Sequence, residues 1–437
     1  MRAYEAYKQI DLPWLDRIPA HWRVQRAKTF FKVINERSVE GKEELLSVSS
    51  TQGVIKRNDA NVTMFQAESY AGYKLCWPKD LVVNSLWAWQ NGLGFSNYYG
   101  IVSTAYSVYR LKNSHANYHY YNYLLRSSAF QWELRIRSKG IWKSRYILSD
   151  EDFLNSPIIC PPREEQDAIV RFLDAKCAKI DRLIKLKERQ IALLNEKKQI
   201  MINQAVTRGL DPNVPMKGSG VDWIGEIPEG WEVINFSRLL IEITQGWSPS
   251  TENEERQNDQ WGVLSLSAVK DGEFCPDAVK PIPRTVPVNT TLALKRGDFL
   301  LTRSNTRMLV GDVCIVDIEP TKLIPSDLIY KLSLHDIIEK KFLLYFLKSN
   351  MGRMQIERSA CGSSGTMPKL THQHIKNWKI ILPPLSNQNE IIAYISNRIS
   401  SMNSMIKNLK KHCDILIEYR TSLISDVVTG KINILPN

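Results

Sequence analysis

Residues 161–200 read PPREEQDAIVRFLDAKCAKIDRLIKLKERQIALLNEKKQI, and residues 383–422 read PPLSNQNEIIAYISNRISSMNSMIKNLKKHCDILIEYRTS. Each stretch opens with two prolines, carries a glutamine four residues after the second proline, and then continues to Gly209 or Gly430 without another Pro or Gly. Proline is compatible with the first turn of a helix, whereas glycine commonly ends one. Each stretch therefore predicts one long helix, and the two align at an offset of 222 residues.

Both predicted helices carry apolar residues in alternating steps of four and three. Sustained over about five heptads, this spacing predicts a coiled-coil seam. The predicted seam residues are Leu173, Cys177, Ile180, Ile184, Ile191, Leu194, Ile395, Ile399, Met402, Ile406, Leu409, Cys413 and Leu416. Lys187, Lys198 and Arg420 interrupt the seam, and such polar interruptions often fix the register of a coiled coil.

A helix of about 40 residues is roughly 60 Å long. If the two helices pair antiparallel, they form one rod with a module at each end. The alternative is that each helix packs on the surface of its own module. The matched register of the two seams favours pairing.

The segments that precede the helices also repeat. A Trp-x-x-x-Ile-Pro-x-x-Trp motif opens each copy, at Trp14 and at Trp223. Short β-branched and aromatic runs such as 81–84 and 105–111 predict strands, and one helix per copy is expected near 118–128 and 337–349. The chain is therefore expected to be α+β, with two pseudo-symmetric α/β modules and two long helices. A duplicated fold whose copies have no paired function is the alternative.

Composition narrows the classes of function. The 437 residues carry a net charge of +12 and a pI near 9.2, which favours a polyanionic partner such as nucleic acid. Seven cysteines without a Cys-x-x-Cys pair indicate reduced thiols rather than a disulfide or zinc framework. No apolar run is long enough to cross a bilayer, and the N-terminal residues lack an apolar signal segment. We therefore expect a cytoplasmic protein with no membrane partner.

Motifs for catalysis are missing from the sequence. It contains no Gly-x-x-x-x-Gly-Lys-Ser/Thr phosphate loop, no Asn/Asp-Pro-Pro-aromatic motif of amino-methyltransferases, and no glycine-rich cofactor loop after a strand. The histidine pairs His115/His119 and His372/His374 lack an acidic third ligand nearby, so neither predicts a metal site. The chain is expected not to be an enzyme and to hold neither a metal nor a cofactor.

These motifs together resemble the DNA-specificity subunit of type I restriction–modification systems. The resemblance rests on the two Trp-x-x-x-Ile-Pro-x-x-Trp openings, on the Gly297-Asp298-Phe299 strand, and on the two Pro-Pro-x-x-x-Gln motifs before long helices. It covers essentially the whole chain in the order module, helix, module, helix. The first copy departs from the pattern, with Lys79 where the second has Gly297.

The resemblance implies a domain for each segment. Residues 1–160 and 212–382 would be target-recognition domains, and residues 161–211 and 383–437 would be the spacer helices. The two domains would read the halves of a bipartite, asymmetric site in double-stranded DNA, with the gap set by an antiparallel coiled coil. The chain would dock two modification (methyltransferase) subunits and restriction/translocase subunits. S-adenosylmethionine, ATP and Mg would be bound by those partner subunits.

Four loops are candidates for DNA contact, because bidentate side chains on exposed loops read base edges. Residues 135–145 are strongly basic, and the matching segment 358–369 is rich in Ser and Gly. Residues 302–307 follow a predicted strand, as does the counterpart at 84–91; residues 49–52 and 244–246 are weaker candidates. The predicted DNA-binding residues are Arg135, Arg137, Lys139, Lys143, Arg145, Arg303, Asn305, Arg307, Ser363, Ser364, Thr366 and Lys369.

Two other functions remain open on the sequence alone. The chain could be a non-catalytic coiled-coil scaffold that joins two protein partners, with an incidental basic surface. It could also be a nuclease or methyltransferase with an unrecognised site. Steep salt dependence would distinguish DNA binding from apolar protein docking, and turnover by the isolated chain would indicate an enzyme.

Overall fold

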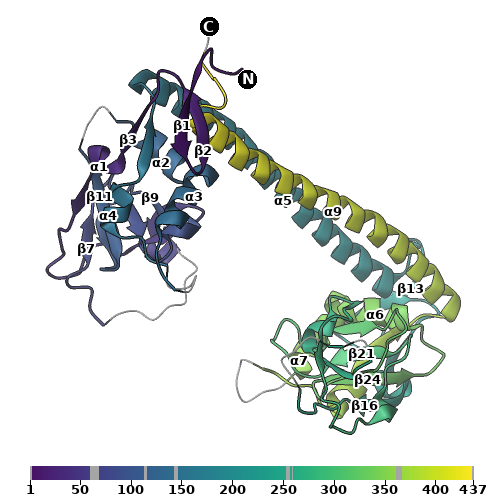
Figure 1. The fold of residues 1–437 in the computed structure, drawn as a ribbon. Helices are drawn as coiled ribbons and strands as arrows, with labels where there is room; N and C mark the ends of the chain where they lie inside the picture. Colours follow the sequence, from purple (N-terminus) through teal and green to yellow (C-terminus); the bar gives the residue numbers. More distant parts are fainter. Residues whose placement is uncertain are drawn as a thin grey trace. The chain divides into compact units, whose positions relative to one another are not determined.

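The computed structural model of the protein describes residues 2–59, 68–112, 116–141, 146–251, 256–257, 259–360 and 367–435. The chain forms two compact units: unit 1 comprises Met1–Glu188 and Lys410–Asn437, and unit 2 comprises Arg189–Leu409. The long helices α5 (Arg163–Arg208) and α9 (Leu385–Val428) each contribute residues to both units (Figure 1). Within the described ranges, no helix combines the length and apolarity needed to cross a membrane.

A four-stranded antiparallel sheet is the centre of unit 1. Its strand order is β4 (Phe31–Ile34), β11 (Tyr106–Leu111), β8 (Leu81–Asn84) and β9 (Leu93–Phe95). The first three residues of β8 are apolar and fully buried, which explains why this strand reads as a continuous apolar run. Helices α2 (Tyr118–Leu125), α3 (Ser128–Arg137) and α4 (Asp150–Leu154) contribute Tyr120, Phe130 and Phe153 to the core that covers one face.

The sheet of unit 2 repeats this order. It runs β16 (Leu240–Gln245), β24 (Ile329–Leu334), β21 (Phe299–Thr302) and β22 (Val313–Ile315), again antiparallel throughout. Helices α6 (Lys340–Lys348), α7 (Asn350–Ser359) and α8 (His372–Lys376) match α2, α3 and α4 in order. Unit 2 also contains a separate three-stranded sheet of β20 (Val279–Pro281), β17 (Gly262–Leu264) and β23 (Leu323–Ile324).

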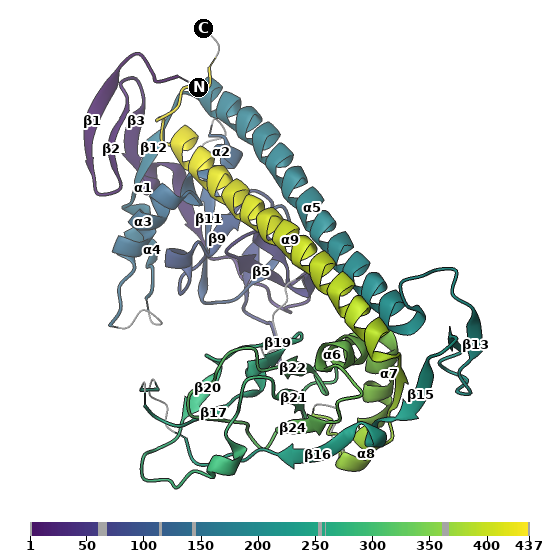
Figure 2. The same cartoon turned by 90° about the vertical axis from the view of Figure 1, so that its right-hand side faces the viewer.

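Shorter elements complete each unit (Figures 1 and 2). Those of unit 1 are β1 (Tyr7–Leu12), β2 (Leu15–Pro19), β3 (Arg23–Arg26), α1 (Ala27–Phe30), β5 (Leu46–Ser49), β6 (Gly53–Lys56), η1 (Arg57–Asp59), β7 (Lys74–Cys76), η2 (Ala88–Gln90), β10 (Gly100–Val102) and β12 (Pro157–Cys160). Those of unit 2 are β13 (Met216–Gly218), β14 (Glu226–Pro228), β15 (Glu232–Asn235), η4 (Phe236–Arg238), η5 (Leu266–Ala268), β18 (Val269–Lys270), β19 (Glu273–Phe274), η6 (Thr290–Leu292) and β25 (Lys379–Leu382).

One buried glutamine joins each module to its long helix. In unit 1, the Gln166 side chain donates from Nε2 to the Pro161 carbonyl (2.8 Å) and accepts from the backbone N–H of Asn117, the N-cap of α2 (3.0 Å). In unit 2, Gln388 accepts from the backbone N–H of Glu339, the N-cap of α6 (2.8 Å). The repeated glutamine of the sequence therefore ties the N-terminus of a module helix to the start of the long helix.

The stretches of α5 and α9 within each unit pack against each other. In unit 1, Asp181 pairs with Arg420, and Lys187 Nζ lies 3.4 Å from His412 Nδ1, so the two stretches run antiparallel. In unit 2, Lys198 Nζ donates to Asn403 Oδ1 at 3.4 Å. The charged residues that interrupt the seam thus each meet a polar partner on the other helix. The predicted α+β class, with two similar modules and two long pairing helices, is confirmed.

Candidate nucleic-acid interface

Two of the segments selected from the sequence meet in each unit. In unit 1, the backbone N–H of Leu148, after α3, donates to the carbonyl of Ser85, just after β8, at 2.9 Å. In unit 2, the backbone N–H of Leu370, after α7, donates to the carbonyl of Arg303, just after β21, at 2.8 Å. The two hydrogen bonds occupy equivalent places in the repeat. Each unit therefore presents a double loop, which we define by its described residues: 84–92 with 138–141 and 146–148 in unit 1, and 302–312 with 360 and 367–370 in unit 2.

The basic residues of unit 1 are less available than the sequence suggested. Arg135 and Arg137 belong to the last turn of α3, so the prediction that they lie on a loop is wrong. The helix continues to this point because Glu133 and Arg137 are four residues apart and form an ion pair on one face. Glu133 is buried and also accepts from the indole Nε1 of Trp14 at 2.9 Å. Arg137 therefore neutralises a buried carboxylate.

The other basic residues of this segment differ in their surroundings. Lys139 is exposed and its ammonium lies 2.9 Å from Asp152 Oδ1. The Ser149 hydroxyl and the Lys139 ammonium lower the pKa of Asp152. Arg135 is exposed, with its guanidinium 5.8 Å from the centre of the Trp132 ring. Lys143 and Arg145 lie outside the described residues.

Replacing Arg137 by alanine is expected to destabilise unit 1 by about 2 kcal/mol and to leave DNA specificity unchanged. The charge of Glu133 would lose its partner, and an unpaired buried charge is costly, although the partial exposure of Arg137 reduces the cost. Chemical denaturation gives the stability, and methylation mapping gives the specificity. Arg135→Ala is the matched control, with unchanged stability and weaker DNA binding. A stable Arg137→Ala protein with one relaxed base position would show that Arg137 reads DNA instead.

In unit 2 the double loop holds Arg303 in a half-buried position. Its guanidinium lies 5.9 Å from the centre of the Tyr330 ring, and Nη1 donates weakly to the Asp327 carbonyl at 3.5 Å. His372 packs its ring against the same Tyr330, at 4.9 Å between centroids. Burial, followed by the charges of Lys376 and Arg303, lowers the pKa of His372. This shift favours the neutral form of His372.

The remaining candidates of unit 2 lie on or beside the same loop. Asn305 is half-buried, and its side-chain Oδ1 accepts a hydrogen bond from the backbone N–H of Thr306 at 2.8 Å. Arg307 is exposed. Lys369 is exposed and its backbone bridges that of Ser304. Ser363, Ser364 and Thr366 lie outside the described residues. The structure brings Arg303, Asn305, Arg307 and Lys369 together, and their contact with DNA stays a prediction.

Unpaired buried polar atoms mark both double loops. Among the described residues, the buried side-chain N and O atoms without a hydrogen-bond partner are Asn91 Oδ1, Arg303 Nε and Ser304 Oγ. All three belong to the loop that follows the central strand β8 or β21. Since buried polar groups in folded proteins are nearly always paired, such atoms call for a physical explanation. A polar ligand at these loops would supply one.

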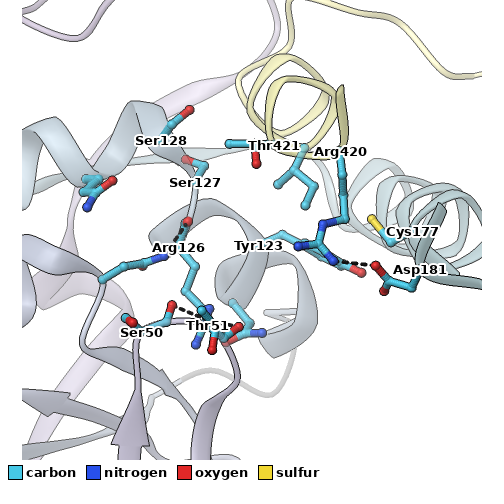
Figure 3. A pocket seen from close by; sticks show the side chains of 14 residues that line it. Ser50, Thr51, Tyr123, Arg126, Ser127, Ser128, Cys177, Asp181, Arg420 and Thr421 are labelled. Atoms are coloured by element: carbon cyan, nitrogen blue, oxygen red, sulfur yellow. Dashed lines mark hydrogen bonds and ion pairs between the residues drawn. The ribbon is translucent and has the colours of Figure 1, made fainter. Parts of the chain in front are cut away.

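A polar pocket of about 400 Å³ in unit 1 has a structural role (Figure 3). The guanidinium of Arg126 donates to the carbonyls of Ser50 (3.1 Å), Thr51 (2.8 Å) and Leu93 (2.8 Å), and its burial lowers its pKa. It thereby fixes the turn between β5 and β6, one of the weaker candidates from the sequence. On the opposite wall Arg420 is paired with Asp181. The charged side chains of the pocket are therefore paired within the protein: Arg126 with backbone carbonyls, and Arg420 with Asp181.

The predicted seam residues differ in burial along the helices. The buried ones are Leu173, Cys177, Ile180, Ile184, Ile395, Met402, Ile406 and Cys413. The half-buried ones are Ile191, Leu194, Ile399, Leu409 and Leu416. In the part of the chain that the structure describes, no group of His, Cys, Asp or Glu side chains has a metal-binding arrangement.

Sequence reasoning missed the exposed apolar residues of unit 1. Leu86, Trp87, Trp132 and Ile136 are each more than 40% exposed, on two elements that contact each other, the loop after β8 and α3. A signal was available in the sequence, because the run Leu86-Trp87-Ala88-Trp89 lies directly before the turn-forming Asn91-Gly92. Apolar residues next to a turn can be either buried or exposed, and only the tertiary structure shows that these are exposed.

Comparisons with known proteins agree with the repeated architecture. Residues 228–412 match the family model of the type I restriction modification DNA specificity domain. The chain is 25% identical over 442 residues to the type I restriction enzyme MjaVIII specificity subunit of Methanocaldococcus jannaschii, covering 96% of this chain and 94% of that protein. It is 29% identical over 174 residues to the type I restriction enzyme EcoEI specificity subunit of Escherichia coli, covering 39% of this chain and 29% of that one.

A solved structure supports the fold. A chain from a structure concerned with assembly and conformational transition of the type I restriction–modification system superposes with a TM-score of 0.67. The superposition covers 95% of this chain and 99% of that chain, at 18% sequence identity. With the repeated modules and the paired long helices, these matches show that the chain is similar to type I restriction–modification specificity subunits, and that residues 228–412 match the specificity-domain family.

Proposed function

We propose that this chain is the DNA-recognition subunit of a type I restriction–modification complex. Each unit reads one half of a bipartite, asymmetric site in double-stranded DNA, and the pairing of α5 with α9 sets the gap between the halves. The observation that carries this proposal is the double loop, which has the same backbone connection in both units and different side chains in each. Equivalent positions with different chemistry suit two different half-sites.

The charge of the chain supports DNA as the ligand. A net charge of +12 favours association with phosphates through release of counterions. In unit 2 the double loop combines the guanidinium of Arg303 with unpaired buried polar atoms, and an Arg fork suits the O6 and N7 atoms of guanine. The chemistry of methylation and cleavage is proposed to belong to partner subunits, which would bind S-adenosylmethionine, ATP and Mg.

The long helices offer surface for those partners. Large apolar residues of both helices are exposed, beyond those that the seam buries, and exposed apolar surface of this kind often marks a protein interface. In unit 1 these residues are Leu183, Leu186, Ile415, Ile417 and Tyr419. We propose that two modification subunits dock on the helices and that restriction subunits join the complex through them.

Methylation mapping tests the function directly. DNA from cells that carry this chain with its modification partner is expected to contain methylated adenines in a two-part motif with a fixed gap. Binding by the purified complex is expected to fall steeply with salt, because phosphate contacts release counterions. Absence of new methylation with an active partner, together with salt-insensitive protein docking, would instead support the scaffold function.

A further inference from the structure

The loop after β8 is rigidly built. Its backbone closes on itself: Trp87 N–H donates to the Asn84 carbonyl (2.9 Å), Gly92 N–H donates to the Trp87 carbonyl (2.9 Å), and Asn84 N–H donates to the Gly92 carbonyl (2.8 Å). Asn91 adopts a left-handed conformation (φ 66°), and a Cβ atom at Gly92 would lie 2.8 Å from the Trp87 carbonyl oxygen. The backbone of residues 84–92, part of the unit 1 double loop, is therefore closed by its own hydrogen bonds.

The tip of this loop holds two large apolar side chains in solvent. Leu86 is 41% exposed and Trp87 is 54% exposed. The small Ala88 next to them is fully buried and anchors the tip. A pre-organised loop that exposes adjacent Leu and Trp side chains indicates a surface that a ligand covers.

The equivalent loop of unit 2 is polar at the matching positions, and its exposed apolar residues, Met308 and Leu309, lie further along the loop. Counted from the end of the central strand, Ser304 and Asn305 occupy the places of Leu86 and Trp87. Counted back from the next strand, the counterparts are Thr306 and Arg307, which are also polar. On the neighbouring helix, Arg358 of α7 stands at the position of Ile136 of α3. A protein partner common to both units would meet the same chemistry twice, whereas two different DNA half-sites would not.

The surroundings of the apolar tip favour a polyanion. The exposed Trp132 and Arg135 of α3 lie beside the loop, since the Gln131 side chain donates to the Trp89 carbonyl at 3.3 Å. The guanidinium of Arg135 over the Trp132 ring places a cation beside the apolar surface. Proteins that distort DNA combine such cations with apolar side chains that enter between base pairs.

We propose that Leu86 and Trp87 form an apolar wedge that enters a base-pair step in the half-site read by unit 1. This inference rests on the proposed function and adds the mode of recognition. Unit 1 recognises how readily its half-site unstacks, while unit 2 reads base edges with polar side chains. Flexible pyrimidine–purine steps are the preferred sites of such insertion.

The test uses the full complex with its modification partner and DNA that carries the mapped site. The adenine analogue 2-aminopurine, whose fluorescence rises on unstacking, replaces the adenines of both strands one at a time through both half-sites. The modification subunits are expected to flip out the adenines that they methylate, which raises the fluorescence at those positions. At one further step, in a single half-site, wild-type complex is expected to raise the fluorescence through insertion of the wedge. Trp87→Ala is expected to abolish this rise and to weaken binding on the order of 10- to 100-fold. Trp87→Phe retains much of both, because a flat ring can still insert.

Two controls separate the wedge from other roles. Trp77 is also exposed in unit 1 but precedes β8, at the other end of the strand, so Trp77→Ala is expected to leave binding and fluorescence unchanged. Arg135→Ala is expected to reduce the salt dependence of binding by about one phosphate contact, whereas Trp87→Ala leaves it unchanged.

The outcomes discriminate between the proposals. Binding by Trp87→Ala within twofold of wild type, or fluorescence that does not respond to Trp87, would overturn the wedge. Loss of the modification partner from the Trp87→Ala complex would identify the tip as a protein-docking surface and also overturn it. A wild-type complex that neither binds nor methylates a two-part site would overturn the proposed function itself, and the wedge with it.

Discussion

Replacing Gln388 by leucine is expected to lower the free energy of unfolding of unit 2 by about 3 kcal/mol. The side chain is fully buried and makes three hydrogen bonds. Its Nε2 donates to the carbonyls of Pro383 (2.8 Å) and Ile337 (3.0 Å), and its oxygen accepts from the Glu339 N–H (2.8 Å). Leucine has a similar volume and would leave these backbone groups buried and unpaired, at roughly 1–3 kcal/mol for each unsatisfied group.

Hydrogen exchange and chemical denaturation of the full chain measure this effect. The amides at the start of α6 are expected to exchange faster in Gln388→Leu, because the Glu339 N–H loses its acceptor. Gln166→Leu is the matched variant in unit 1 and should loosen the start of α2. Gln190→Leu, at an exposed position of α5, is the control and should change stability by less than about 0.5 kcal/mol. Equal stability of Gln388→Leu and Gln190→Leu would contradict the role of Gln388 in tying the N-terminus of α6 to the start of α9.

Replacing Arg303 by alanine is expected to weaken DNA binding by about 1–3 kcal/mol and to relax one base position in the half-site read by unit 2. The guanidinium is held over the Tyr330 ring, with its Nε buried and unpaired, so it is oriented before DNA arrives. Pre-organisation of this kind reduces the entropy lost on binding. Arg303→Lys keeps the charge but loses the planar fork, so it is expected to restore affinity only in part and specificity hardly at all.

Methylation mapping and binding to single-base variants of the site measure both effects. Arg238→Ala removes an exposed charge elsewhere in unit 2 and is the control for net charge. It is expected to leave the base preference unchanged. Uniform weakening by Arg303→Ala across all sequences would assign Arg303 to a phosphate contact, and unchanged binding would exclude it from the interface.

Much of the fold could be predicted because its main signals are periodic and local. The helices α5 and α9 follow from heptad spacing between prolines and glycines, and the strand β8 follows from a short apolar run. Because the chain is duplicated, each element is predicted once in each copy, and the order of elements in one copy supports the order in the other. The segments that form the double loops were also selected, since strand ends and turn residues are visible in a sequence.

The sequence could not show which side chains of those segments are free. Arg137 carries the right charge for DNA contact, yet it is paired with Glu133 in the same helix. A spacing of four residues predicts an ion pair only if both residues lie in one helix, and the sequence did not show that α3 extends to Arg137. Trp87 lies in a segment selected only as a loop, and its exposure of 54% is visible only in the folded structure.

The sequence by itself therefore determined the repetition, the α+β class, the two long helices and the similarity to type I specificity subunits. The tertiary structure alone decided that residues 84–92 meet the segment after α3, that residues 302–312 meet the segment after α7, and which polar atoms there lack partners. The physical reason is range. Helix periodicity and turn chemistry act between neighbours along the chain, whereas burial and pairing of a side chain depend on groups brought close only by folding.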